Sequence, residues 1–331
     1  MENRYSRQIA YIGKWAQDKI GKSKVCIIGC GALGSSSAEL LARSGVGTIK
    51  LVDRDFLELS NIQRQSVFSE EDINLPKALG LANKLKRINS SINIIAEVED
   101  FNPKNAESLI NGYDLVIDGL DNMQSRFVLN EACVKLQIPW IYGSAIRNVG
   151  YVSFIDVTTN CLNCFIKKLP MKTEVCETSG ITNSIISLIS AVQSNEALKY
   201  LGGQKYTLMR LLLYADLEHM IMKSFSVRKD PNCRVCSLRK FDFLGGSCES
   251  RITSLCGSNS YHISPPYKIR LDMRVSKERL PPGFLVTAEN EFLIKAGQNK
   301  KELTIFTDGR VITKNMKKDE AESAFRKIVL V

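Results

Sequence analysis

Residues 24–45 read KVCIIGCGALGSSSAELLARSG: a short apolar run, a glycine-rich loop, and a helical segment that ends at Gly45. An apolar run of this length that ends in glycine is typical of a strand buried on both faces. In the loop, Gly29 permits a tight turn, Gly31 lets a nucleotide approach the backbone, and Gly34 lets helix and strand pack closely. The loop by itself therefore predicts a nucleotide or dinucleotide site.

The alternation of strands and helices continues beyond this loop. Further strands are predicted at 48–53, 92–98, 115–118, 140–144 and 151–156, and helices at 77–88, 106–111 and 124–136. This pattern predicts an α/β fold with a Rossmann-like, doubly wound and mostly parallel sheet. A long apolar helix from about Asn183 to Tyr200 and two strands at 208–214 and 220–226 follow, so the sheet is expected to continue into antiparallel strands.

A stretch rich in Gly, Ser and Cys divides the chain. We expect a first domain over residues 1–243, a linker over 244–262, and a small α+β module over 263–331. The module has predicted strands at 284–287, 292–296, 303–306 and 311–313, with Asp308-Gly309 as a hairpin turn and an amphipathic helix over 319–329.

Charge and composition limit the classes of partner. Lys and Arg number 45 against 35 Asp and Glu, a net charge of +10, which suits either simple solubility or an acidic partner. The basic residues are scattered and form no run interleaved with aromatics, which disfavours nucleic acid. Charged residues interrupt every apolar run, and the first residues lack the apolar core of a signal peptide, so we expect a cytoplasmic protein with no membrane partner.

Polar residues beyond the loop distinguish between nucleotide chemistries. Asp53 lies 19 positions after Gly34 at the end of the second strand, where an acid can bind ribose hydroxyls in an NAD or an ATP enzyme alike. The residues that follow favour a triphosphate with its metal ion: Asp55, Asn61, Arg64, Gln65, Lys77 and Asp121. They indicate cleavage of a phosphate anhydride rather than hydride transfer.

These residues belong to short motifs that occur in a fixed order. The motifs are Arg4-Tyr5-Ser6-Arg7-Gln8, the loop 29–34, Asp53-Arg54-Asp55, the run SNIQRQ at 60–65, Pro76-Lys77, the run DGLDN at 118–122, two Cys-x-x-Cys pairs, and Cys176. In this order the chain resembles the ubiquitin-activating-enzyme-like adenylyltransferases, the ThiF, MoeB and HesA superfamily.

The resemblance implies a role for each site residue. Arg64 and Lys77 would neutralise the phosphates of ATP, and Arg7 would reach into the partner subunit's site. Asn61 and Gln65 would bind phosphate or fix the arginine. Asp121 would ligate Mg²⁺, while Asp55 would order the loop or reach the metal indirectly.

The resemblance also implies a substrate. The enzyme would be a homodimer that adenylates the C-terminal Gly-Gly carboxylate of a small ubiquitin-like sulfur carrier of the ThiS or MoaD type, releasing pyrophosphate. The product would feed sulfur transfer or conjugation, with a sulfurtransferase or cysteine desulfurase as a further partner. We expect the C-terminal module to dock the carrier or to cover the active site.

Three other functions fit parts of the sequence. An NAD-dependent oxidoreductase of Rossmann type explains residues 29–53 but leaves Arg64, Lys77 and Asp121 without a role. Adenylation of a tRNA base is a second alternative. A non-catalytic scaffold predicts losses among the phosphate-handling residues, and those mapped here are retained.

The clustered cysteines point to a metal. With no export signal, the ten cysteines are expected to be reduced, so clustered ones suggest metal binding or catalysis. The pairs Cys161/Cys164 and Cys233/Cys236 have the spacing of a closed, structural Cys₄ zinc site, the alternative being buried or reactive thiols.

Three further cysteines were considered for chemistry. Cys176 precedes a helix, which favours a thiolate, although Glu174 and Glu177 oppose that charge. The resemblance to ThiF-like relatives implies that this thiol accepts the activated acyl group or joins a persulfide exchange; the alternative is an exposed thiol without a role. Cys248 and Cys256 could form a redox pair, relay sulfur, or have no role.

Overall fold

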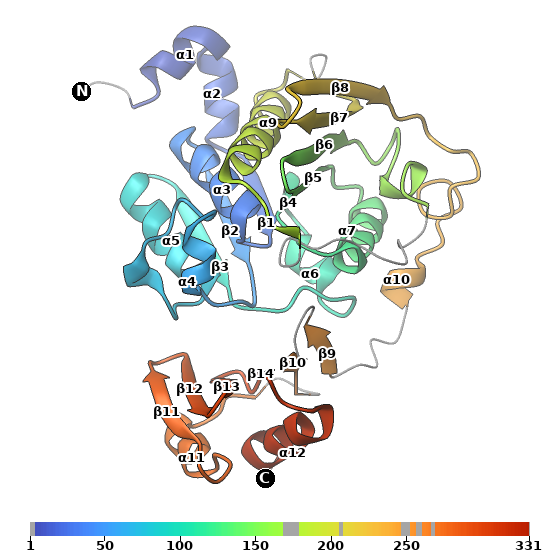
Figure 1. The fold of residues 1–331 in the computed structure, drawn as a ribbon. Coiled ribbons are helices and arrows are strands. Elements are labelled where there is room, and N and C mark those ends of the chain that lie inside the picture. The colour runs from blue at the N-terminus through green and yellow to red at the C-terminus, as the bar shows by residue number, and fades with distance from the viewer. Residues whose placement is uncertain are drawn as a thin grey trace. The chain divides into compact units, whose positions relative to one another are not determined.

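The computed structural model describes residues 4–167, 179–204, 208–245, 252–255, 260–265 and 269–330. By internal contacts the chain divides into two compact units, Met1–Gly246 and Ser247–Val331, which Figure 1 shows as ribbons. Each unit has its own sheet, and we treat each separately.

The first unit is built on an eight-stranded sheet with the order β3-β2-β1-β4-β5-β6-β7-β8. Its parallel part comprises β1 (Lys24–Ile28), β2 (Thr48–Val52), β3 (Asn93–Glu97), β4 (Leu115–Asp118) and β5 (Trp140–Ile146). Its antiparallel part adds β6 (Val149–Ile155), β7 (Leu211–Asp216) and β8 (Ile221–Ser226). The predicted doubly wound sheet that continues into antiparallel strands is therefore confirmed.

Helices cover both faces of this sheet (Figure 1). The apolar cluster on one face includes side chains of α3 (Ala32–Arg43), α5 (Lys77–Ile88) and α9 (Asn183–Leu201). The cluster on the other face includes side chains of α6 (Ala106–Ile110) and α7 (Met123–Leu136). Alternate residues of β1 divide between the two clusters, because successive side chains of a strand point to opposite faces. This explains why residues 24–28 form one continuous apolar run.

Several short helices of the first unit were not predicted from the sequence pattern. The chain begins with α1 (Ser6–Ile12) and α2 (Lys14–Ile20), separated by Gly13 with φ 82°. A third, α4 (Leu59–Ile62), follows β2, and α10 (Asp242–Gly245) ends the first unit. Helices of four to seven residues carry too few turns for an apolar period to emerge. No helix of the described residues is long and apolar enough to cross a membrane.

The second unit is an antiparallel sheet with the order β11-β12-β13-β14-β10-β9. Its elements are β9 (Ile252–Leu255), β10 (Ser260–Ile263), α11 (Met273–Glu278), β11 (Leu285–Glu289), β12 (Leu293–Gln298), β13 (Lys301–Phe306), β14 (Val311–Lys314) and α12 (Lys318–Val329). The stretch 244–262, expected as a linker, thus contains β9 and β10, and the division between the units falls at Gly246. The sequences of these strands include Ser and Thr and resemble a polar linker, but β10 pairs with β14 and β9 pairs with β10.

Candidate active site and cysteine centre

The glycine loop forms the turn between β1 and α3, and two of its three glycines are required by the chain's own packing. A Cβ on Gly29, where φ is 90°, would lie 2.5 Å from the carbonyl oxygen of Gly119. A Cβ on Gly34 would lie 1.8 Å from the carbonyl oxygen of Gly29. At Gly31, in contrast, the nearest atom to such a Cβ is 4.0 Å away, so the space above this residue is open.

Asp53 lies directly after β2 and forms a hydrogen bond with the glycine loop. Its Oδ2 accepts a hydrogen bond from the backbone N–H of Cys30 at 2.6 Å, and its Oδ1 accepts one from the N–H of Asp55 at 2.6 Å. Burial raises the pKa of Asp53 to about 6, against the opposing charge of Lys77. Each carboxylate oxygen thus holds a backbone N–H group, and contact with ribose stays a prediction.

Lys77 is the first residue of α5 and lies beside Asp55. The segment after β2 pairs with the segment before α5, and the N–H of Lys77 donates to the carbonyl oxygen of Asp55 at 2.8 Å. This pairing places Lys77 Nζ 3.3 Å from Asp55 Oδ2, with only 8% of the residue exposed. Burial acts to lower the pKa of Lys77, but the carboxylates of Asp55, Asp53 and Asp121 raise it above its ordinary value. The buried amine therefore stays a cation.

Asp121 lies in the loop after β4, exposed to solvent. The next residue, Asn122, caps α7, because its Oδ1 accepts the N–H of Ser125 at 2.8 Å. Behind the loop, Arg126 Nε donates to Asp118 Oδ2 at 2.8 Å, and Arg126 Nη2 donates to the carbonyl oxygen of Gly143 at 2.9 Å. This buried ion pair, which sequence reasoning missed, fixes the loop that presents Asp121. The helix also contains Asn130 and Glu131, so no signal in its sequence singled out Arg126.

The run at 60–65 forms α4 and the turn that follows. Asn61 Oδ1 accepts the N–H of Glu58 at 3.3 Å, and Arg64 Nη1 donates to the carbonyl oxygen of Ser60 at 2.9 Å. Gln65 is only 2% exposed, yet its Oε1 accepts no hydrogen bond within the described part of the chain. Buried polar atoms of this kind usually have a partner, so Gln65 offers an acceptor for a bound group or a water.

A second cation beside Asp55 was also missed by sequence reasoning. Arg54 Nη1 donates to Asp100 Oδ1 at 2.8 Å, and its Nε lies 3.7 Å from Asp55 Oδ1. Asp55 therefore lies between Arg54 and Lys77, and the structure brings these residues together with the glycine loop at the carboxyl edge of the parallel strands.

Arg7 does not join this cluster within its own subunit. Arg7 lies exposed on α1. Cys176 lies outside the described residues, as do Cys248 and Cys256.

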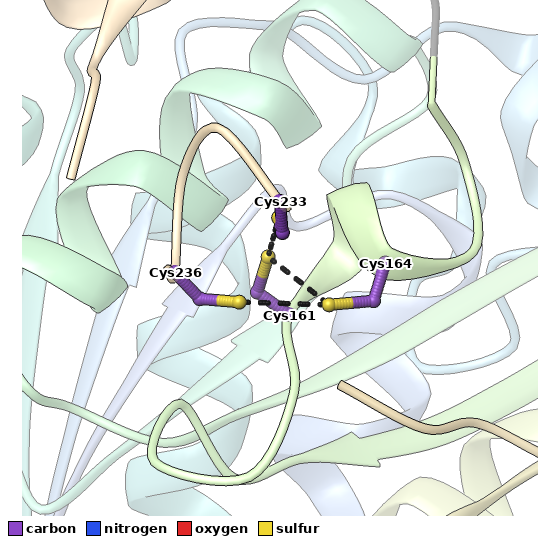
Figure 2. Close-up of side chains that lie close together, drawn as sticks. All are labelled: Cys161, Cys164, Cys233 and Cys236. Carbon is purple, nitrogen blue, oxygen red and sulfur yellow. Dashed lines mark hydrogen bonds between the residues drawn. The ribbon is translucent and has the colours of Figure 1, made fainter. Parts of the chain in front are cut away.

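The four predicted metal ligands do come together (Figure 2). The sulfur atoms of Cys161 and Cys233 are 3.5 Å apart, as are those of Cys164 and Cys236, and Cys161 lies 4.0 Å from Cys164. All four ligand atoms lie within 4.8 Å of one another. A tetrahedral zinc ion with Zn–S bonds of 2.3 Å would separate its sulfurs by about 3.8 Å, so the donor set and its spacing fit this ion.

Helix α7 supports the 161–164 segment of this cysteine centre and the helix α10 that follows the 233–236 segment. Asn130, fully buried, accepts the N–H of Leu162 at 2.9 Å and donates to Asn163 Oδ1 at 2.8 Å. Its neighbour Glu131 accepts the N–H groups of Phe243 and Leu244, each at 2.9 Å. One helix thus extends from the Asp121 loop to the cysteine centre.

Comparison with known proteins places the chain in a family. The sequence profile described as the ThiF family matches residues 5–235. The chain is 33% identical over 318 residues to the sulfur carrier protein ThiS adenylyltransferase of Bacillus subtilis, covering 94% of each protein. This alignment is longer than the first unit, so it extends into the second.

Other relatives match about 70% of the chain. The adenylyltransferase and sulfurtransferase MOCS3 of Anopheles gambiae is 34% identical over 240 residues, covering 71% of this chain and 54% of the relative. The SAMP-activating enzyme E1 of Haloferax volcanii is 30% identical over 238 residues, covering 71% of this chain and 88% of the relative.

Among solved structures, E. coli MccB shares the fold. Its TM-score is 0.64 at 23% identity, covering 73% of this chain and 74% of MccB. The chain therefore belongs to the ThiF family, and it is an adenylyltransferase.

Proposed function

We propose that this enzyme adenylates the C-terminal Gly-Gly carboxylate of a small ubiquitin-like sulfur carrier, with ATP as the adenylyl donor. The observation that carries the proposal is the meeting of the glycine loop, the Lys77–Asp55 pair and the Asp121 loop at one edge of the sheet. The relative that is similar over 94% of both chains is named for adenylation of ThiS, which supports the class of acceptor.

The reaction requires little proton chemistry. An ionised carboxylate oxygen attacks the α-phosphorus of ATP, the bond from that phosphorus to the bridging oxygen breaks, and pyrophosphate leaves with the electron pair. The open space at Gly31 lets the phosphate chain approach the backbone. Lys77 stabilises negative charge that develops on the departing phosphates, and Arg64 joins it by turning from the carbonyl oxygen of Ser60. Asn61 and Gln65 support this arginine or bind phosphate.

Two metal ions belong to the proposal. Asp121 is exposed, and its carboxylate and that of Asp55 both act on the charges of Lys77 and Arg54. Carboxylate oxygens are the donors that Mg²⁺ prefers. When bound, Mg²⁺ neutralises phosphate charge. The four clustered cysteines would hold a structural Zn²⁺, which ties the segment at 161–164 to the segment at 233–236.

A homodimer completes the site. None of the residues of α1, all of which the structure describes, is buried within the subunit, and Tyr11 is 90% exposed. An amphipathic surface of this kind is suited to contact with a second copy. In the proposed dimer, Arg7 of the partner subunit approaches the phosphates of each bound ATP.

Isotope exchange between pyrophosphate and ATP tests the reaction. We expect exchange that depends on Mg²⁺ and on a carrier such as ThiS, and no exchange with the same carrier shortened by its terminal Gly-Gly. Absence of exchange with every Gly-Gly carrier of the source organism would contradict the proposal. Reduction of NAD⁺ by the protein with an added alcohol or hydroxy-acid substrate as hydride donor, in place of exchange, would favour the dinucleotide alternative.

A further inference from the structure

The segment that carries Arg7 is fastened to its own subunit by Tyr5. The ring of Tyr5 packs on Gly45, where a Cβ would lie 2.5 Å from the ring carbon Cζ. The Tyr5 hydroxyl accepts a hydrogen bond from Asn89 Nδ2 at 2.8 Å. Asn89 is fully buried and also donates to the carbonyl oxygen of Ala42 at 2.8 Å. The side-chain amide of Asn89, itself fixed by Ala42, therefore holds the Tyr5 hydroxyl in place.

Two neighbours of Arg7 strengthen this attachment. Gln8 Nε2 donates to the carbonyl oxygen of Ser44 at 2.9 Å and to Gln17 Oε1 at 2.7 Å. Arg4 Nη1 donates to the carbonyl oxygen of Ile88 at 2.6 Å. We call the set Tyr5, Gln8, Gly45 and Asn89 the Tyr5 clamp.

The clamp holds α1 by one face and leaves the other face outward. Gln8 and Ile12 are partly buried against the subunit. Arg7 and Tyr11, four residues apart and therefore on one side of the helix, are exposed. The contacts of the motif RYSRQ thus fall on the residues around Arg7 and not on Arg7 itself.

Asn89 also connects the clamp to the subunit's own active site. It directly follows α5, the helix whose first residue is Lys77. Twelve residues of α-helix span about 18 Å, so one rigid element has the phosphate-binding lysine at one end and the clamp at the other.

We propose that Tyr5 and Asn89 are positioning residues for Arg7, holding α1 so that this arginine enters the partner subunit's site at a fixed place. This rests on the proposed function, in which Arg7 acts across the dimer. The physical reason is that an arginine on a short helix otherwise samples many positions. A misplacement of about 1 Å in a catalytic group can reduce the rate by about 100-fold.

The test is complementation between inactive subunits. Two differently tagged variants are co-expressed, and the mixed dimer is purified through both tags and assayed for exchange. Arg7→Ala paired with Lys77→Ala should recover activity at one of the two sites, since one site then holds an intact lysine and receives an intact arginine. Tyr5→Ala should lower exchange about 100-fold as a homodimer. A Tyr5→Ala subunit should be rescued by a Lys77→Ala subunit, whose well-placed Arg7 completes the intact site of the Tyr5→Ala subunit. It should not be rescued by an Arg7→Ala subunit, because neither site of that dimer receives a correctly placed arginine.

The outcomes separate the clamp from the shared site. Rescue of Tyr5→Ala by Arg7→Ala, or no rescue by Lys77→Ala, would overturn the clamp while leaving the shared site in place. Failure of the Arg7→Ala and Lys77→Ala pair would overturn the shared site and the clamp with it.

Two further variants distinguish loss of the clamp from a general loss of folding. Tyr5→Phe keeps the ring on Gly45 and removes only the hydroxyl, so we expect a loss of about fivefold with the same complementation pattern. Tyr113→Ala removes a partly buried tyrosine near Lys50, away from the clamp, and should keep exchange close to that of the unmodified enzyme. Loss in Tyr113→Ala equal to that in Tyr5→Ala would show that the effect is general destabilisation and would overturn the clamp.

Discussion

Lys77 Nζ lies 3.3 Å from Asp55 Oδ2, so the first residue of α5 pairs with an acid just beyond β2. The pair leaves the buried lysine charged before any nucleotide arrives. We expect Lys77→Ala to lower the exchange rate about 100-fold, the usual cost of removing a charged donor from developing negative charge. Lys84→Ala is the matched control on the same helix, because Lys84 pairs with Glu71 and Asp72 instead. Equal losses in both variants would argue against a phosphate role for Lys77.

The glycines of the loop should respond differently to alanine. Gly34→Ala places a Cβ 1.8 Å from a carbonyl oxygen, and we expect it to lower the free energy of unfolding by about 3 kcal/mol or more. Gly31→Ala meets no protein atom nearer than 4.0 Å, so stability should change by less than about 0.5 kcal/mol. Its KM for ATP should rise about tenfold, because the Cβ occupies the space proposed for the phosphates. Denaturant unfolding and exchange kinetics measure the two effects, and an unchanged KM would contradict the proposed approach of the phosphates to Gly31.

Asp53 should make the activity depend on pH. Its pKa is raised to about 6 by burial, so the charged form that accepts two backbone N–H groups is complete only above that pH. We expect exchange to fall as the pH drops through 6. The free energy of unfolding depends on pH in the opposite direction. Between about pH 4 and pH 6 the folded protein keeps the Asp53 proton and the unfolded chain has lost it, so the contribution of Asp53 to stability declines as the pH rises through this range. An exchange rate that is constant down to pH 5 would rule out this assignment.

The cysteine centre should hold one zinc ion per chain. It joins segments that are 72 residues apart, so its loss removes a cross-link from the fold. We expect a strong chelator to lower the melting temperature by about 5 °C or more, and Cys161→Ser to purify with far less than one zinc per chain. Cys133→Ala, a buried cysteine outside the centre, should keep the full zinc content. Elemental analysis that finds no zinc in the native enzyme would refute the site.

The folded protein should be less stable with one member of the Asp118–Arg126 ion pair replaced than with both replaced. Arg126→Met leaves Asp118 buried with no opposite charge, and we expect a loss of about 3–5 kcal/mol in the free energy of unfolding. The double variant Asp118→Asn with Arg126→Met should recover part of that loss, because the uncompensated charge is gone. If the single variant is as stable as the native enzyme by calorimetry, the pair does not fix the Asp121 loop.

Local pattern predicted the larger elements well. The apolar runs of β1, β2 and β4 and the helices α3, α5 and α9 appear within one or two residues of their expected bounds. The short helices α1 and α4 were missed, because four to seven residues hold too little periodicity. The strands β9 and β10 lie in the stretch predicted as a linker, because their polar residues form strands only by pairing, β10 with β14 and β9 with β10.

The site shows the same division between local and distant information. The types of residue at the glycine loop, Lys77, Asp121 and the two cysteine pairs could be predicted from the sequence, since each occurs in a short motif beside a strand end or at a ligand spacing. Their meeting could not, because the order β2-β1-β4 and the return of residues 74–77 to the end of β2 depend on pairing between distant segments. Only the tertiary structure shows that Asp53 accepts the N–H of Cys30 in the glycine loop and that of Asp55, and that Arg126 is buried behind Asp121. The sequence by itself determined which chemical groups the enzyme has, because motifs are local; the tertiary structure decided which of them touch, because contact energies act between residues far apart in the chain.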